Sequence, residues 1–408
     1  MRGRLLRLLL PIDRFTAADR RVTVTIWMAG LVQGFAQSQV SATLPFTRAG
    51  LGLTEAQMSL LIGLARLAAF AALPLGWMAD RRGRRRPFLI AVALVLAGGA
   101  LAGTAASAWQ FGFLHAVLRT GTATMAGLGV VILAETVSPT VRAYAISFYG
   151  AAVSLGAGLA ILALPLADGG GDNWRISHLI VGVGVLLLPV LMRRVPETTG
   201  GHADMGDWGE LARSEWGSRF WKVAFAGFLA SAYGTFVTSF TTERLVTQLG
   251  LGTDTTVALL LAGGTAGGAG FFIGGRMADH YGRRGTAVIA LIVGLLGGIA
   301  LFTVESIPAL ILAVFMSSFG TFALVPAGGA HRAELFPPEL RSLAGTAAAN
   351  FTLAGASAGL FAGTATIDLL GLSGTVYVLA IGGAIAAVVT ATLPETLHRP
   401  ATGRSLKP

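Results

Sequence analysis

Apolar stretches of about 20 residues, each long enough to cross a bilayer as an α-helix, recur along the whole chain. Hydrophobic residues fill 54% of the 408 positions and charged residues only 12%, far below the charged share of a soluble protein. We predict an all-α polytopic membrane protein with twelve transmembrane helices. These lie at residues 22–44, 57–78, 88–107, 111–134, 143–166, 177–192, 221–242, 255–277, 285–304, 309–330, 342–370 and 375–393.

The net charge of +10 raises the question of a nucleic-acid partner, but the positive residues follow the predicted spans instead. Most lysines and arginines fall in loops on one side of the membrane, which the positive-inside rule assigns to the cytoplasm. We therefore predict a bacterial-type inner-membrane protein with both termini cytoplasmic, and expect no nucleic-acid partner. Residues 1–21 are predicted as a cytoplasmic arm rather than a signal peptide, since their apolar run is short and broken by Arg7.

Three short motifs occur twice, at offsets of 198 or 199 residues, which indicates a duplicated half. The pairs are Gly76, Asp80, Gly83 and Arg84 with Gly275, Asp279, Gly282 and Arg283; Glu135 and Arg142 with Glu334 and Arg341; and the Pro-Glu-Thr sequences at 196–198 and 394–396. We predict two six-helix bundles, 22–195 and 221–395, related by pseudo-twofold symmetry about the membrane normal. A cytoplasmic linker, 196–220, joins them, and a cytoplasmic tail follows at 396–408.

The doubled G-x-x-x-D-x-x-G-R-[RK] loop resembles the most specific signature of the major facilitator superfamily, and the resemblance covers essentially the whole chain. The E-x(6)-R loops and Pro-Glu-Thr endings are similar to those of its sugar-porter and metabolite:proton symporter branches. The resemblance implies alternating access and proton coupling. Twelve helices in one chain can form a complete pathway, so we expect a monomer in the lipid bilayer. Glutamines of the sugar porters are absent from 144–154 and 221–242, so a sugar is not carried over as the substrate.

The doubled loops are predicted to act as gates. Asp80 and Asp279 stand where a helix ends, so their carboxylates can meet guanidiniums or the positive N-terminus of a neighbouring helix. Gly76 and Gly275 are expected to let two helices approach closely. The glutamates at 135 and 334 should end one helix, and the arginines at 142 and 341 should begin the next. By resemblance, these contacts hold the cytoplasmic side closed; the alternative is that the charges only satisfy topology and helix ends.

Arg66 and Arg119 are predicted at membrane depth, in the second and fourth spans. Even on the most lenient insertion scale, placing an arginine at the centre of a membrane helix costs ~2.5–3.5 kcal/mol. Neither has an evident carboxylate partner, so we predict that a substrate anion supplies the missing charge. The alternative is that backbone carbonyls, amides or water satisfy each guanidinium. At the repeat offset the second half carries Thr265 and Ser318, which confines the charge to the first half.

Further polar residues are candidates for the same pathway. Gln33, Gln37 and Ser41 stack along one face of the first span and would line a cavity or bond a neighbouring helix. Tyr233 in the seventh span is a candidate ligand contact, with core packing as the alternative. His115, one turn before Arg119, and Glu243, at the outer end of the seventh span, are the candidates for proton coupling.

Several classes are excluded by what the sequence lacks. It has no cysteine, no catalytic Ser/His/Asp set, no carboxylate pair and no His cluster in one neighbourhood, so we predict no enzyme activity, cofactor or metal. We predict a secondary active transporter for a small organic solute, an organic anion such as a carboxylate metabolite. The rivals are an exporter of drugs or hydrophobic compounds, and a non-transporting membrane receptor on the same fold.

Overall fold

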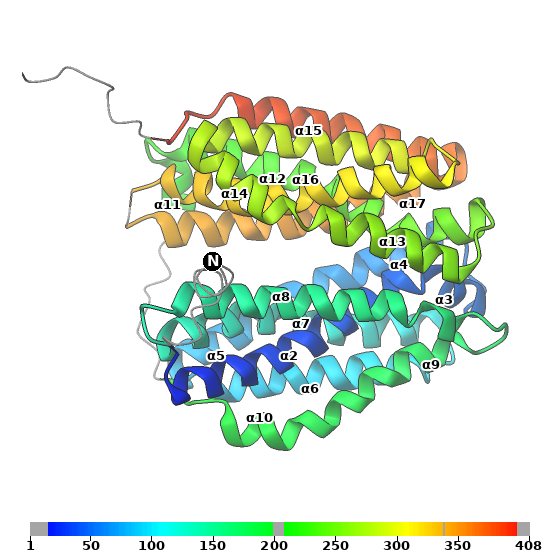
Figure 1. Ribbon diagram of the computed structural model, residues 1–408, viewed down its shortest axis with the longest axis horizontal. Coiled ribbons are helices and arrows are strands. Elements are labelled where there is room, and N and C mark those ends of the chain that lie inside the picture. The colour runs from blue at the N-terminus through cyan, green and yellow to red at the C-terminus, as the bar shows by residue number, and fades with distance from the viewer. Residues whose placement is uncertain (1–14, 199–207, 338, 398–408) are drawn as a thin grey trace, which may run out of the picture. The chain divides into compact units, whose positions relative to one another are not determined.

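The computed structural model describes residues 15–198, 208–337 and 339–397, and every element in these ranges is a helix (Figure 1). The predicted arm and tail lie largely outside the described residues, as does the part of the predicted linker at 199–207. The spans of the first half are formed by α2 (Ala17–Ala42), α4 (Glu55–Leu67) continued by η2 (Ala68–Ala71) and α5 (Ala72–Arg82), α6 (Arg85–Ala102), α7 (Ala108–Thr136), α8 (Arg142–Leu162), and α9 (Trp174–Leu179) continued by η4 (Ile180–Leu187) and α10 (Leu188–Arg194).

The second half repeats this order. Its spans are α12 (Gly217–Glu243) extended by the π-helix η5 (Arg244–Gln248), α13 (Thr253–Gly267) with α14 (Gly270–Tyr281), α15 (Arg283–Leu301), α16 (Ile307–Glu334) and α17 (Arg341–Ala391). Three short helices lie outside the spans: α3 (Leu44–Gly50), η3 (Leu164–Ala167) and α11 (Trp208–Arg213).

The long helix α17 contains two spans. Gly371 has a φ of 69° and a ψ of 179°, a conformation that interrupts the helix and that glycine tolerates because it has no Cβ. By length and composition, ten helices of the described residues can cross a membrane; α17 counts as one of these, and α2, which carries three glutamines, is not among them. With α2 included and α17 divided at Gly371, the architecture is the predicted twelve-helix one.

Local capping explains where several helices begin. Thr16 and Asp19 form a capping box at the start of α2, and Thr54 and Gln57 form another at the start of α4. Ser107 accepts a hydrogen bond from the backbone N–H of Gln110 and so caps α7. These caps fix the helix starts independently of the surrounding lipid.

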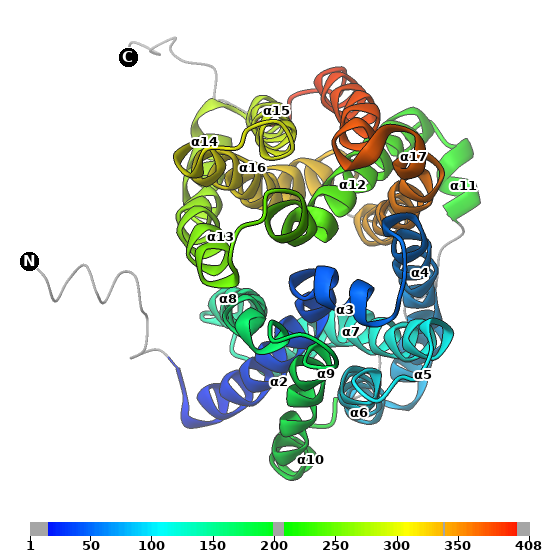
Figure 2. The ribbon, with the colours of Figure 1, turned by 90° about the vertical axis from the view of Figure 1, so that its right-hand side faces the viewer.

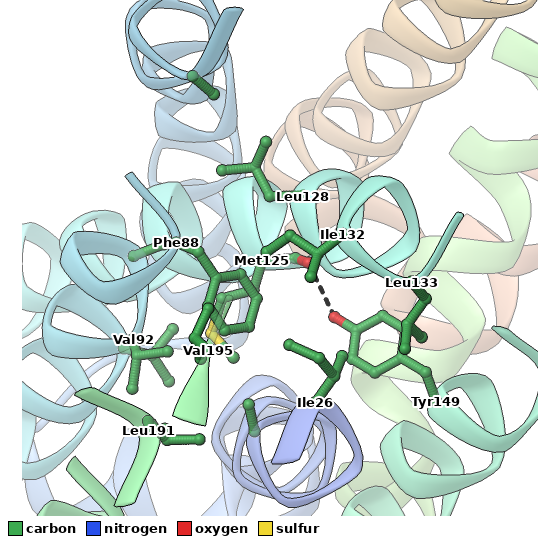
Figure 3. Close-up of a cluster of buried hydrophobic side chains, with 14 of the residues drawn as sticks. Ile26, Phe88, Val92, Met125, Leu128, Ile132, Leu133, Tyr149, Leu191 and Val195 are labelled. Atoms are coloured by element: carbon green, nitrogen blue, oxygen red, sulfur yellow. Dashed lines mark hydrogen bonds between the residues drawn. The ribbon is translucent and has the colours of Figure 1, made fainter. Parts of the chain in front are cut away.

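The chain forms two compact units. Unit 1 comprises Met1–Asp204, Thr238–Val257 and Leu360–Leu369; unit 2 comprises Met205–Val237, Ala258–Gly359 and Leu370–Pro408. The core of unit 1 lies where α2, α6, α7, α8 and α10 meet, around Phe88, Met125 and Ile132 (Figure 3). In unit 2, α16 packs against both α14 and α15 (Figure 2). The bundle boundaries predicted from the sequence, 22–195 and 221–395, stay a prediction.

Candidate functional site

The loop after the second span forms a charge network at one end of the first half. Arg84 precedes α6, and its side chain is 8% exposed; its Nη2 lies 3.6 Å from Asp80 Oδ1 and 3.0 Å from Glu135 Oε1. Its Nη1 also donates to the carbonyl of Ala79, at 3.3 Å. One buried guanidinium therefore ties the end of α5 to the end of α7. We call this end of each half its motif end.

The second half builds the same network. Arg283 lies 3.2 Å from Asp279 Oδ1 and 3.2 Å from Glu334 Oε2, and it donates to the carbonyl of Ala278 at 2.9 Å. The predicted contact between each motif aspartate and a guanidinium is thus present in both halves. The partner arginine is the one four residues after the aspartate, in the same motif.

The Pro-Glu-Thr glutamates complete these networks. Glu395 accepts hydrogen bonds from the backbone N–H groups of Arg283 and Arg284, at 2.7 and 3.1 Å, so it caps the N-terminus of α15. Burial would raise the pKa of this carboxyl, but these backbone hydrogen bonds outweigh it and hold the pKa below its usual value. Gly282 and Gly83, with φ of 115° and 90°, lie against the carboxylates of Glu395 and Glu197, and a Cβ at either position would clash with them.

The helix ends around the E-x(6)-R loops are those expected. Glu135 lies in the last turn of α7 and Glu334 ends α16, while Arg142 and Arg341 begin α8 and α17. Arg341 donates to the carbonyl of Phe336 at 3.1 Å, and Arg142 Nε is buried without a hydrogen-bond partner. The glutamates therefore join the motif arginines, whereas Arg341 bonds the backbone of its own loop.

Within its own unit, neither Gly76 nor Gly275 makes a close contact, and the expected close approach of two helices there stays a prediction. A Cβ added at Gly76 would meet no atom within 4 Å, and one at Gly275 would make only an ordinary contact with Pro326, at 3.7 Å. Glycine is required instead at Gly83 and Gly282, where the backbone turns through a positive φ and a carboxylate lies close.

Arg66 stands at an interruption inside its membrane span. It lies in the last turn of α4, and the chain then passes through the 3₁₀ segment η2 before α5 begins. The interruption frees backbone carbonyls, and the hydroxyl of Thr120 on α7 donates to that of Ala68 at 2.8 Å. The second half has a matching interruption between α13 and α14, after Gly267.

Arg119 lies on α7 and is 7% exposed, while Arg66 is half-buried. The Nε of each guanidinium is buried without a hydrogen-bond partner, and within the described ranges neither arginine forms an ion pair. The two are near enough to repel each other. The structure therefore brings both predicted interior arginines to one neighbourhood of unit 1.

An aromatic cluster surrounds His115, one turn before Arg119. His115 is 1% exposed and stacks on Phe111 with ring centroids 6.2 Å apart. Phe111 also meets the rings of Trp174 and His178 edge-on, at 5.9 and 5.5 Å. Both nitrogens of His115, Nε2 of His178 and Nε1 of Trp174 are buried without a partner.

Gln33 forms hydrogen bonds to neighbouring helices. Its Nε2 donates to the carbonyl of Thr122 at 3.2 Å, and the hydroxyl of Tyr149 donates to its Oε1. Tyr149 also lies 2.9 Å from the carbonyl of Met125, the contact drawn in Figure 3. Gln33 thus bonds α2 to α7 and α8, whereas Gln37 on the same helix is half-buried.

Tyr233 likewise bonds a neighbouring helix. Its hydroxyl donates to the carbonyl of Leu295 on α15, at 2.7 Å, and the side chain is 6% exposed. The contact lies within unit 2 and matches the core-packing alternative. A substrate contact at Tyr233 would have to replace this hydrogen bond.

Glu243 is fully buried and forms an ion pair that the sequence did not reveal. Arg48, in the short helix α3, donates to its Oε1 from Nη2 at 2.7 Å and from Nε at 3.2 Å. Both residues belong to unit 1, and Arg48 also donates to the carbonyl of Leu53 at 3.0 Å. Attraction to Glu243 raises the pKa of Arg48 although burial alone would lower it.

Three groups in this region were missed at the sequence level: the Arg48–Glu243 pair, His178 and Tyr149. Arg48 and Glu243 are separated by 195 residues. His178 begins a predicted span and gives no periodic signal. Among the described residues, no three His, Asp or Glu side chains group as a metal site.

A family model described as Major Facilitator Superfamily matches residues 26–304 and 245–408. The chain belongs to this superfamily. Its members are transporters, so the chain is a multi-pass membrane transporter. A comparison with curated proteins finds no match.

Solved transporters share the fold at low identity. A nucleoside transporter, NupG, superposes with a TM-score of 0.76 at 12% identity, covering 91% of this chain and 99% of its own. The xylose transporter XylE from E. coli gives 0.71 at 17%, covering 93% and 97%. The human organic anion transporter MFSD10 gives 0.66 at 16%, covering 92% and 100%. These three proteins are named for different solutes, so the fold does not select a substrate.

Proposed function

We propose that this transporter carries a small organic anion of the carboxylate class by alternating access, in symport with protons. The observation that supports this is the pair of interior arginines. Arg66 and Arg119 lie near each other in unit 1, and no carboxylate among the described residues pairs with either. An arginine stays protonated in proteins, so the two like charges persist at membrane depth.

A bound anion would relieve this arrangement. A guanidinium presents N–H donors in a fork that fits a carboxylate, and both Nε–H groups here lack partners. Gln37, half-buried on α2, is the remaining amide candidate for the site. Gln33 and Tyr233 are left out because their polar atoms already bond neighbouring helices.

The remaining assignments follow the charge pattern of the chain. We place the motif ends and both termini in the cytoplasm, in an inner membrane, and take the working unit as a monomer. The networks around Arg84 and Arg283 would act as latches, since their ion pairs join the ends of helices that must move when the cytoplasmic side opens. Membership of the superfamily supports a latch role for this motif in general, and its assignment to these residues is part of the proposal.

The first test is a thermal-stability screen of the purified protein against benzoate, succinate, methanesulfonate, xylose and tetraphenylphosphonium. A ligand at 100 times its Kd adds ~2.7 kcal/mol to the stability of the state that binds it. We expect stabilisation by at least one anion, lost in Arg66→Gln and in Arg119→Gln. Arg82→Gln, an exposed arginine at the end of α5, is the matched control and should retain it.

Stabilisation only by xylose or by the cation, unchanged in both variants, would contradict the anion proposal and favour an exporter of neutral or cationic compounds. An anion that binds but is not moved into liposomes would favour a receptor. Flux of the stabilising anion into proteoliposomes, driven by an imposed proton gradient, would support symport.

A further inference from the structure

Two buried histidines stand beside the arginine pair with ring nitrogens that lack partners. His115 is 1% exposed and His178 is 2% exposed, and both contact the ring of Phe111. His178 Nδ1 lies 3.1 Å from the carbonyl of Trp174, so it carries the hydrogen and leaves Nε2 as the acceptor. A neutral imidazole at His115 leaves one donor and one acceptor unpaired, which is costly in a buried site.

The charged groups that act on His115 are all positive or neutral. They are Arg119 on its own helix, Arg66 on α4 and His178 on α9. The other helices packed on α7 contribute Tyr149 of α8, which is bonded to Gln33, and the motif-end charges Asp80 and Arg84 next to α6. On α4, Glu55 lies in the first turn and interacts with Arg48 and Glu243. Asp19 of α2 is bonded to Ser138 beyond the motif end of α7.

This surrounding charge links the two ligands. With the site empty, Arg66 and Arg119 oppose a third positive charge on His115. An anion held by the two guanidiniums cancels that opposition and attracts a proton to the imidazole. Linkage is reciprocal, so a proton on His115 must strengthen anion binding by the same factor.

We propose that His115 binds the co-transported proton beside an anion held by Arg66 and Arg119. This inference rests on the proposed function and names the proton site within it. An imidazole nitrogen of His115 accepts one proton from water when the anion loads, and returns it to water when the anion leaves. Arginine cannot perform this step, because it does not release its proton.

Glu243, the other candidate, is less suited to the step. Its Oε1 accepts two hydrogen bonds from Arg48, and the residue is fully buried. Protonating it would leave Arg48 without its counter-charge, so each cycle would have to break a buried ion pair. His115 carries no such bond.

The test measures proton uptake by the purified full-length protein in weakly buffered detergent at about pH 7, where a histidine is poised to titrate. Benzoate, succinate and methanesulfonate are added at matched pH and are deprotonated under these conditions, so any proton taken up binds to the protein. We expect one proton per bound anion, and an anion affinity that rises as the pH falls.

The variants separate the proton site from its neighbours. His115→Gln and His115→Phe should both abolish uptake while the anion still binds, and Phe preserves the stacking on Phe111. His178→Phe should retain uptake and move its midpoint to higher pH, because His178 opposes a positive charge on His115. His280→Gln, an exposed histidine at the motif end of the second half, is the control and should behave as the wild type.

Uptake that survives in both His115 variants would overturn the inference and leave the proposed function standing. Anion binding without proton uptake in the wild type would overturn the inference together with the proton-symport part of the proposed function, and would leave anion transport standing. If none of the three anions binds, the inference and the proposed function fail together.

Discussion

Arg84 and Arg283 make the same contacts at the motif ends of their halves: an aspartate four residues earlier, a glutamate that ends a helix, and a backbone carbonyl. The interiors differ. At the repeat offset, Arg66, Arg119 and His115 are matched by Thr265, Ser318 and Val314.

The difference teaches which parts of a duplicated chain are free to diverge. A network that braces helix ends is useful in both halves, so both retain it. Charges inside the membrane are costly, and the two predicted interior arginines, Arg66 and Arg119, lie in unit 1, where the proposed anion would offset them. The following variants test whether charges found in one half contribute more to the free energy of folding or binding than charges found in both halves.

Breaking the Arg48–Glu243 pair should have the largest effect. Neither charge has a charged counterpart at the repeat offset, which falls on Thr247 and Leu44. Arg48→Met leaves a fully buried carboxylate uncompensated and should lower the free energy of unfolding by about 3–5 kcal/mol, read from denaturant unfolding in detergent. Adding Glu243→Gln should restore much of the loss. Losses that simply add in the double variant would show that the pair is not a unit.

Arg119→Gln should weaken binding of the stabilising anion by about 2–5 kcal/mol, because the buried carboxylate loses a charged donor. Ser318→Ala, at the matching position of the second half, should change affinity by less than about 0.5 kcal/mol. Isothermal titration of both variants measures the contrast. Equal losses of anion affinity in Arg119→Gln and Ser318→Ala would contradict a functional difference between the interiors of the two halves.

Acid should weaken the first half through Asp19. Burial raises the pKa of this carboxyl, but hydrogen bonds from Ser138 and Thr16 outweigh it and lower the pKa to about 2 from 3.8. The folded form therefore binds its proton less readily than the unfolded form. This contributes about 2 kcal/mol above about pH 4, which is lost as the pH falls through about 2. Asp19→Asn should flatten this part of the stability profile, and an unchanged profile would refute the assignment.

The smallest contrast lies between the repeated networks themselves. The Arg84 side chain is 8% exposed and that of Arg283 is 16% exposed. Arg84→Gln should therefore cost about 1 kcal/mol more than Arg283→Gln, since exposed pairs contribute little. Unfolding midpoints of the two variants, measured side by side, give the comparison. A larger loss at Arg283 would mean that burial does not set the ranking.

Much of the fold could be predicted because lipid imposes a simple length rule on apolar segments, and because loop motifs mark helix ends. The positions of Glu135, Arg142, Glu334 and Arg341 at helix ends followed from sequence alone. The division of α17 was also expected, although the sequence did not single out Gly371 as the residue that makes it.

The polar contacts were harder to predict. Gln33 and Tyr233 have the side chains of ligand contacts, yet each bonds a neighbouring helix, a choice that depends on which carbonyl lies opposite. The Arg48 and Glu243 pairing depends on how distant segments fold together. The close contacts at Gly83 and Gly282 were not foreseen, and the packing role predicted for Gly76 and Gly275 stays a prediction.

The interrupted span containing Arg66 has a consequence for membrane insertion. If the spans insert in chain order, α4, η2 and α5 enter the bilayer before α7, and Thr120 cannot yet bond the free carbonyl of Ala68. The guanidinium of Arg66 and an unpaired backbone carbonyl then both face lipid, so this segment inserts unfavourably on its own. Stable insertion of this segment therefore requires the fourth span, which supplies the hydroxyl of Thr120.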